Sequence, residues 1–231
     1  YCINCAAYTA VDKAEMESEK AFEINATGAK NLAYVCDDHG AVLIHVSTDF
    51  VFDGEKNEPY TETDAANPIS VYGASKLQGE VEIQQALKGH FIIRTSWLYS
   101  EYGNNFMKTI LRLAETRDGI SVVSDQIGTP TYAGDLAEVI LTIIDSKSES
   151  YGIYHYSNEG VASWYDFAKA IFKYSMQNIK LNKISTEDYP TPAKRPLYSV
   201  LDKEKVKGVM SLLIPNWETS LEVAITHFVK A

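Results

Sequence analysis

Long apolar segments are missing from this 231-residue chain, and so is any excess of positive charge. No hydrophobic run approaches the ~20 residues that a membrane-spanning helix needs, which argues against a transmembrane protein. The formal net charge is −10 at pH 7, whereas a surface for nucleic acid or anionic lipid would need a basic patch. We therefore expect neither nucleic acid nor membrane as a partner.

Cysteine is also scarce, with three residues in the whole chain. Cys2 and Cys5 have the spacing of a metal-binding knuckle, but residues three apart on a strand point to opposite faces. No second Cys/His pair would complete four ligands, and the histidines show no ligand spacing. We predict no metal and interpret Cys2 and Cys5 as buried thiols. Together with Cys36 they suit a reducing compartment, which indicates the cytoplasm.

What the chain does contain is an alternation of continuous apolar strands with amphipathic helices. Strands are predicted at residues 1–7, 41–46, 91–95, 120–123 and 152–156. Helices are predicted at residues 17–38, 72–87, 105–116, 132–145, 164–174 and 217–229. This pattern is typical of an α/β fold with a doubly wound parallel sheet. Gly28 lies in the middle of the first helix, which indicates close packing of that helix on the sheet.

The regular alternation loosens beyond residue 157. We therefore predict two units. A Rossmann-type dinucleotide-binding domain would comprise residues 1–102 and 129–157, and a smaller α+β substrate-binding domain would comprise residues 103–128 and 158–231.

One group of side chains indicates a chemistry. Residues 72–76 read Y-G-A-S-K, and this spacing places Tyr72 and Lys76 on one face of a helix. The preceding strand ends in Thr48 and Asp49, at the edge where open α/β sheets bind ligands. A phenol, an ammonium and a hydroxyl are the groups needed to protonate a carbonyl oxygen during its reduction. We expect Lys76 to lower the pKa of Tyr72, and Thr48 to hydrogen-bond the same substrate oxygen.

The Tyr-x-x-x-Lys pair alone is weak evidence, because a chain with 15 tyrosines contains about one such pair by chance. A second copy, Tyr165 and Lys169, opens an amphipathic helix without a strand-end hydroxyl before it. We interpret this second copy as structural. For the first copy the structural alternative stays open, with Tyr72 as a packing residue and Lys76 as a solvated charge.

Longer stretches carry a resemblance to a known family. Residues 47–54, S-T-D-F-V-F-D-G, followed by Y-G-A-S-K at 72–76, resemble the extended short-chain dehydrogenase/reductases. Within that superfamily the whole chain is similar to the dTDP-4-dehydrorhamnose reductases. Further similar stretches are residues 4–15, 94–99, 103–106, 125–131 and 189–196. The resemblance implies reduction of the 4-keto group of dTDP-4-dehydro-L-rhamnose, a nucleotide sugar, with NADPH or NADH as the cofactor.

The resemblance also implies a role for each matching residue. Tyr72 would be the proton donor, Lys76 its partner and a ribose ligand, and Thr48 the hydroxyl that lowers the donor's pKa. The implied contacts of the cofactor's nicotinamide half are Ala6, Ala7, Tyr8, Thr9, Tyr72 and Lys76. The implied substrate contacts are Thr48, Asp49, Trp97, Asn105 and Arg195.

Three of these substrate contacts have a plain structural alternative. Trp97 could fill a crevice at a strand end. Arg195 could be a surface charge in a proline-rich loop, although its planar fork suits a pyrophosphate. Asn105 is predicted first as a helix cap and only second as a nucleotide contact.

Other functions of similar proteins stay open. Sugar-nucleotide dehydratases carry an acid directly after the Thr-Asp pair, where this chain has Phe50, and epimerases rarely have the Asp, so the sequence favours reduction. A non-catalytic relative of the methionine adenosyltransferase regulatory subunit would act through protein contacts. Such a protein has no need to keep Thr48, Tyr72 and Lys76 together.

No strand in the chain is followed by G-x-x-G-x-x-G. The resemblance implies such a turn at the front of the fold, where the cofactor pyrophosphate sits on a helix N-terminus. We therefore expect the chain to be a fragment that lacks about two β–α units and binds cofactor poorly. Residues 1–7 would then be an exposed edge strand, open to association with another chain or a second copy in a homodimer.

Overall fold

The computed structural model describes residues 1–230. Four parallel strands form its main sheet in the order β1-β2-β3-β8. They are β1 (Cys2–Asn4), β2 (Leu43–Thr48), β3 (His90–Thr95) and β8 (Gly152–His155). Within the described residues β1 pairs only with β2, so it lies at an edge of this sheet. Because all four strands are parallel, their carboxyl ends meet along one side of the sheet.

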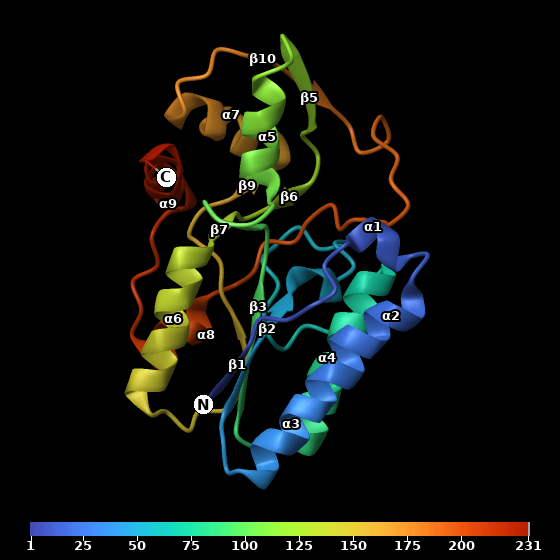
Figure 1. The fold of residues 1–231 in the computed structure, drawn as a ribbon, viewed down its shortest axis with the longest axis vertical. Helices are drawn as coiled ribbons and strands as arrows, with labels where there is room; N and C mark the ends of the chain where they lie inside the picture. Colours follow the sequence, from blue (N-terminus) through green and yellow to red (C-terminus); the bar gives the residue numbers. More distant parts are fainter. Residues whose placement is uncertain (231) are drawn as a thin grey trace.

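Helices cover both faces of the main sheet (Figure 1). On one face α3 (Gly28–Asp38) and α4 (Val71–Ala86) pack against Leu43 and Ile92. On the other face α6 (Ala133–Ser146) and α8 (Glu204–Met210) pack against Ile44 and Phe91. The predicted doubly wound parallel α/β fold is thereby confirmed.

A second hydrophobic core lies at one end of the sheet. Figure 1 shows α5 (Phe106–Ala114), α7 (Trp164–Tyr174) and α9 (Trp217–Lys230) gathered there. The strand β5 (Gly119–Val123) belongs to this end and not to the main sheet, because it pairs with β10 (Lys180–Ile184). Short pairs complete the strands: β4 (Leu98–Tyr99) with β7 (Thr131–Tyr132), and β6 (Ile127–Gly128) with β9 (Ala162–Ser163).

The helix predicted at residues 17–38 contains a change of helical type. After α1 (Val11–Ala14), α2 (Ser18–Phe22) passes through a π-helical segment, Glu23–Thr27, into α3. The close approach predicted at Gly28 is wrong, because a Cβ there would meet only Glu23 O, at 3.7 Å. The tight contact is made by Gly79 of α4, where a Cβ would lie 2.2 Å from Asn25 O in the π-helical segment.

The thiols are distributed differently from the prediction. Cys36 is buried and Cys2 is half-buried, but Cys5 is exposed because β1 ends at Asn4.

Among residues 1–230, no group of three His, Cys, Asp or Glu side chains is placed to hold a metal ion. Within the same residues no helix is long and apolar enough to cross a membrane.

Candidate active site

Strand β2 ends at Thr48 and Asp49 follows it directly; both polar residues are buried. Thr48 Oγ1 donates to Asp49 Oδ1 at 3.1 Å and accepts from Phe50 N at 3.2 Å. This contact caps the short 3₁₀ turn Asp49–Val51. Within the described chain Asp49 Oδ2 has no hydrogen-bond partner, and burial raises the pKa of Asp49 from 3.8 to about 6. An unpaired buried carboxylate oxygen of this kind is suited to a ligand hydroxyl.

The first turn of α4 lies directly on the turn that follows Thr48. Ser70 caps the helix by accepting from Gly73 N at 3.1 Å. A Cβ at Gly73 would lie 2.1 Å from Phe50 O, so only glycine allows this approach. The approach brings the Tyr72 ring edge-on to the Phe50 ring, with 5.5 Å between centroids. Tyr72 therefore lies beside the turn that follows Thr48.

The protonation of Tyr72 differs from the prediction. Burial raises the pKa of Tyr72 to about 12, and a hydrogen bond with Thr48 opposes this only in part. Asp49 raises the pKa further, and Lys76 is not among the groups that shift it. The expectation that Lys76 lowers the pKa of Tyr72 is therefore wrong in this structure.

The reason lies in the direction of the Lys76 side chain, which is buried. Its Nζ donates to Val46 O at 2.8 Å and lies 3.1 Å from His45 Nε2. Burial lowers the pKa of Lys76 to about 8, and the Glu80 carboxylate acts in the opposite direction. Lys76 is thus neither a solvated charge nor an ion-pair partner of Tyr72.

The second Tyr-x-x-x-Lys copy has a different environment. Lys169 is exposed on α7, and the helix begins with a capping box in which Ser163 and Asp166 satisfy each other's backbone N–H groups. This arrangement supports the structural interpretation of Tyr165 and Lys169.

The loop after β1 is held by a residue that sequence reasoning missed, Asn25 of the π-helical segment. Asn25 Oδ1 accepts from Tyr8 N at 2.8 Å, and Nδ2 donates to Tyr8 O at 3.1 Å. Nδ2 also donates to Ser75 Oγ at 2.9 Å, one position before Lys76. The sequence signal was an Asn among the apolar positions of the predicted helix. This buried amide joins the loop to α4.

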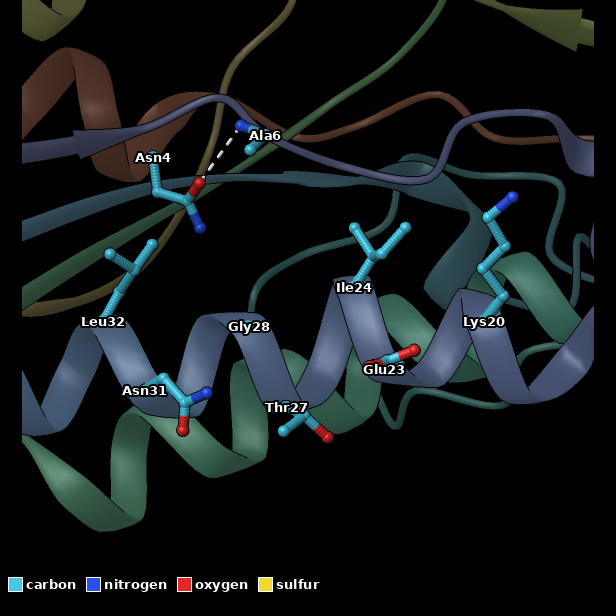
Figure 2. Close-up of a pocket in the computed structure, with 9 residues that line it drawn as sticks. All are labelled: Asn4, Ala6, Lys20, Glu23, Ile24, Thr27, Gly28, Asn31 and Leu32. Carbon is cyan, nitrogen blue, oxygen red and sulfur yellow. Dashed lines mark hydrogen bonds between the residues drawn. The ribbon is translucent and has the colours of Figure 1, made fainter.

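The other predicted cofactor contacts lie on the same loop. Ala6 and Thr9 are exposed and Ala7 is half-buried. Figure 2 shows Ala6 above a pocket of about 520 Å³, toward which Ile24 and Lys20 extend from the helix below. The loop thus offers accessible backbone next to the buried polar residues of the sheet.

A second cavity, of about 750 Å³, opens between the end of β2 and the α5–α7 region. Phe50, Trp97 and Arg195 line it, so three segments far apart in the sequence meet there. The Trp97 ring stacks on Trp164 with 3.7 Å between ring centroids. Trp97 therefore does not fill a crevice alone; it forms an aromatic wall of the cavity.

Arg195 and Asn105 are engaged within the protein. Arg195 pairs with both carboxylate oxygens of Asp12, at 3.0 and 2.8 Å, and lowers the pKa of Asp12. Asn105 accepts from Lys108 N at 3.2 Å and so caps α5, while its amide donates to Ser100 O at 2.6 Å. The predicted cap role of Asn105 is confirmed, and its amide donor is already used within the protein.

Comparison with known proteins agrees with this arrangement. The family model of the RmlD substrate binding domain matches residues 1–230. A dTDP-4-dehydrorhamnose reductase of Aggregatibacter actinomycetemcomitans is 46% identical over 230 residues, which cover 95% of this chain and 78% of that protein. A crystal structure of the Bacillus anthracis dTDP-4-dehydrorhamnose reductase in complex with NADP has a TM-score of 0.94 at 45% identity, and the match covers 97% of this chain and 79% of that one.

A UDP-glucuronic acid 4-epimerase from Bacillus cereus shares the fold alone, at 19% identity and a TM-score of 0.83, over 99% of this chain and 74% of that one. The doubly wound sheet, with Tyr72 beside the turn that follows Thr48 at the carboxyl end of β2, defines a short-chain dehydrogenase/reductase of the extended type. Within that class, the chain belongs to the dTDP-4-dehydrorhamnose reductase family.

Proposed function

We propose that this chain donates the proton in the NADPH-dependent reduction of the 4-keto group of dTDP-4-dehydro-L-rhamnose. The observation that carries the proposal is the packing of the first turn of α4, which bears Tyr72, on the turn that follows Thr48 at the end of β2. The names of the similar proteins support the substrate, and the NADP complex of the Bacillus anthracis relative supports the cofactor.

Burial raises the pKa of Tyr72 to about 12, so the phenol is protonated at neutral pH and has a proton to give. In the proposed reaction the ketone carbon gains a hydride, the Tyr72 proton goes to the ketone oxygen, and the product is an alcohol. Thr48 would hold the same oxygen, and the unpaired oxygen of Asp49 would accept from a sugar hydroxyl. Trp97 would pack beside the sugar, and Arg195 would face the pyrophosphate from the cavity wall.

The chain offers matching groups for the nicotinamide half of the cofactor, which supplies the hydride when bound. The accessible backbone of Ala6 and Thr9 lies on a loop that Asn25 fixes to α4. Lys76 and Tyr72 are one helical turn apart on α4, so a ribose hydroxyl could reach both. Ala7 and Tyr8 complete the loop, and we propose the same role for them. We propose NADPH rather than NADH, because the Bacillus anthracis relative is in complex with NADP.

We also propose the two-unit division of the chain and its cellular setting. The core of α5, α7 and α9 supports a separate substrate-binding unit. One segment differs from the boundaries predicted by the sequence, because Val206 and Met210 of α8 pack on the main sheet.

The free cysteines support a reducing cytoplasm, and the edge position of β1 supports association with a second chain.

The test compares two tyrosine variants, each made in a protein that also carries the glycine-rich cofactor turn implied by the resemblance. Tyr72→Phe should lower the rate of NADPH oxidation with dTDP-4-dehydrorhamnose by about 10²–10⁴-fold, with little change in substrate binding. Tyr165→Phe alters the structural copy of the motif and should leave the rate unchanged. An unaltered rate in the Tyr72→Phe variant would refute the proposal.

A further inference from the structure

The backbone of Trp97 lies in the left-handed region, with φ at +47°. A residue with a Cβ rarely adopts this conformation, and a bulky one does so only where its surroundings hold it there. Trp97 lies between β3 and β4, where the chain leaves the main sheet, and it lines the cavity of about 750 Å³. The contacts that hold this backbone therefore also decide where the indole stands in the cavity wall.

The segment that holds the Trp97 backbone is residues 128–131. Ser96 Oγ donates to Thr129 O at 2.7 Å, and Thr131 N donates to Trp97 O at 3.3 Å. The short ladder of β4 and β7 continues this contact along the chain. The backbone on both sides of the indole is thus tied to one segment.

Gly128 of the same segment makes room for the indole. Gly128 is buried, and a Cβ there would lie 2.7 Å from Trp97 Cε2, 2.8 Å from Cζ2 and 2.9 Å from Nε1. Any side chain at this position would overpack the site and force the ring to move. Gly128 belongs to strand β6 and has no positive φ, so glycine is needed here for space alone.

Trp164 limits the position of the same ring. The two indoles are stacked, with 3.7 Å between ring centroids and 10° between their planes. Trp164 is the first residue of α7, directly after the helix cap Ser163. Because β6 pairs with β9, Gly128 lies opposite Ala162, two positions before Trp164. One short ladder therefore brings both Gly128 and Trp164 to the Trp97 indole.

We propose that Gly128 and Trp164 are positioning residues, which hold the Trp97 indole as a preformed wall of the sugar subsite before substrate enters. Gly128 is buried and acts on the cavity through the ring, and Trp164 holds the ring by stacking. A wall that is already ordered loses little conformational entropy when a ligand binds against it, so the affinity is higher. The placing of the sugar rests on the proposed function, and the arrangement of the two rings does not.

Nuclear Overhauser contacts between the two indole rings test the arrangement in the chain without ligand. Replacing each of the three tryptophans by phenylalanine in turn assigns their signals. The wild-type chain should show contacts between Trp97 and Trp164. Gly128→Ala should lose them, because the added methyl group displaces the Trp97 ring. Absent contacts in the wild type, or unchanged contacts in Gly128→Ala, would overturn the proposal.

Binding of dTDP-rhamnose, measured by titration calorimetry, tests the consequence for the site. Gly128→Ala should lower the affinity about fivefold or more. In a chain that already carries Trp97→Leu, the same substitution should change the affinity less than about twofold, because the ring that the methyl group meets is gone. Equal losses on the two backgrounds would overturn the proposal.

The double variant also carries the test if Gly128→Ala alone does not fold. Gly128→Ala combined with Trp97→Leu removes the clash and should fold. A double variant as unfolded as the single one would show that the indole is not what Gly128 accommodates, and would overturn the proposal.

The matched control is Gly134→Ala on α6. A Cβ at Gly134 would lie 2.5 Å from Tyr132 Cε1, so this variant also sets a methyl group against an aromatic ring. It should keep the contacts between the two indoles and the affinity for dTDP-rhamnose. A loss of either would show that loosened packing alone is responsible, and would overturn the proposal. If the wild-type chain does not bind dTDP-rhamnose, the proposed substrate is wrong, and the ring contacts still test the positioning.

Discussion

The Glu80 carboxylate on α4 binds the Arg94 guanidinium on β3 through two points in the interior of the protein. Arg94 Nε lies 3.0 Å from Glu80 Oε1, and Arg94 Nη2 lies 2.6 Å from Oε2. Ser47 Oγ donates to the same carboxylate at 2.5 Å. The guanidinium also lies over the Phe52 ring, 5.2 Å from its centroid. These contacts fix α4, and with it Tyr72 and Lys76, against the carboxyl half of the sheet.

Glu80→Gln should strongly destabilise the protein. The substitution leaves the buried guanidinium of Arg94 without its counter-charge, which costs about 3–5 kcal/mol of unfolding free energy. Urea unfolding followed by circular dichroism measures the loss. Glu82→Gln is the control on the same helix, because Glu82 pairs with Lys30 at the surface and its loss should have a much smaller effect. Equal losses in the two variants would contradict this account.

Asp49→Asn should stabilise the protein at high pH and not at low pH. Burial raises the pKa of Asp49 to about 6. The contribution of Asp49 to the unfolding free energy is therefore full below about pH 4 and is lost as the pH rises through 6. A neutral amide avoids that loss and should add about 2–3 kcal/mol to the unfolding free energy at about pH 8. Urea titrations at both pH values measure the difference.

The control for this pH dependence is Asp53→Asn. A hydrogen bond from Glu55 N lowers the pKa of Asp53, so the carboxylate stabilises the folded protein once the pH is above the ordinary aspartate pKa. Asp53→Asn should therefore lower the unfolding free energy at high pH and not at low pH, the reverse of the trend for Asp49→Asn. A gain for Asp49→Asn that is the same at both pH values would contradict the assigned cause.

Gly79→Ala should destabilise the packing of α4 on the π-helical segment. The added Cβ would lie 2.2 Å from the backbone oxygen of Asn25, which cannot rotate away as a side chain would. We expect a loss of about 1–3 kcal/mol, together with faster amide exchange at Tyr8, because Asn25 holds that backbone. Gly208→Ala on α8 meets nothing within 4 Å and should be neutral or slightly stabilising. A stable Gly79→Ala protein with unchanged exchange would refute the contact.

Trp97→Ala should weaken binding of dTDP-rhamnose, used as a probe of the cavity. The substitution removes one side of the aromatic wall formed with Trp164, and we expect at least about tenfold lower affinity. Titration calorimetry measures the affinity. Trp217→Phe changes a tryptophan in the core of α7 and α9 and should leave the affinity unchanged. If both variants bind alike, the cavity is not the nucleotide site.

Much of the fold could be predicted because hydrophobic periodicity reports local burial. The helix predicted at 164–174 is α7, Trp164–Tyr174, and the strand predicted at 91–95 lies within β3. The strand at 120–123 was predicted in its place along the chain, but its partner was not. Periodicity says that a strand is half-buried and does not say which distant strand covers it.

In the candidate site, too, some features could be predicted from the local sequence and others could not. The sequence predicts Thr48 at a strand end and Tyr72 in the first turn of a helix, and in the structure Gly73 lets that turn pack on the turn after Thr48. The direction of Lys76 depends on His45 and Val46 across the helix–sheet interface, and no spacing along the chain encodes it. The pairing of Arg195 with Asp12 spans 183 positions and could not be predicted for the same reason.

By itself, the sequence determined the α/β class, the order of the longer helices and of the main-sheet strands, and the presence of a phenol and an alcohol near one end of the sheet, because these depend on residues near one another in the chain. Only the tertiary structure decided which buried groups are charged, since burial and the partners contributed by distant segments set the protonation of Tyr72, Lys76 and Asp49.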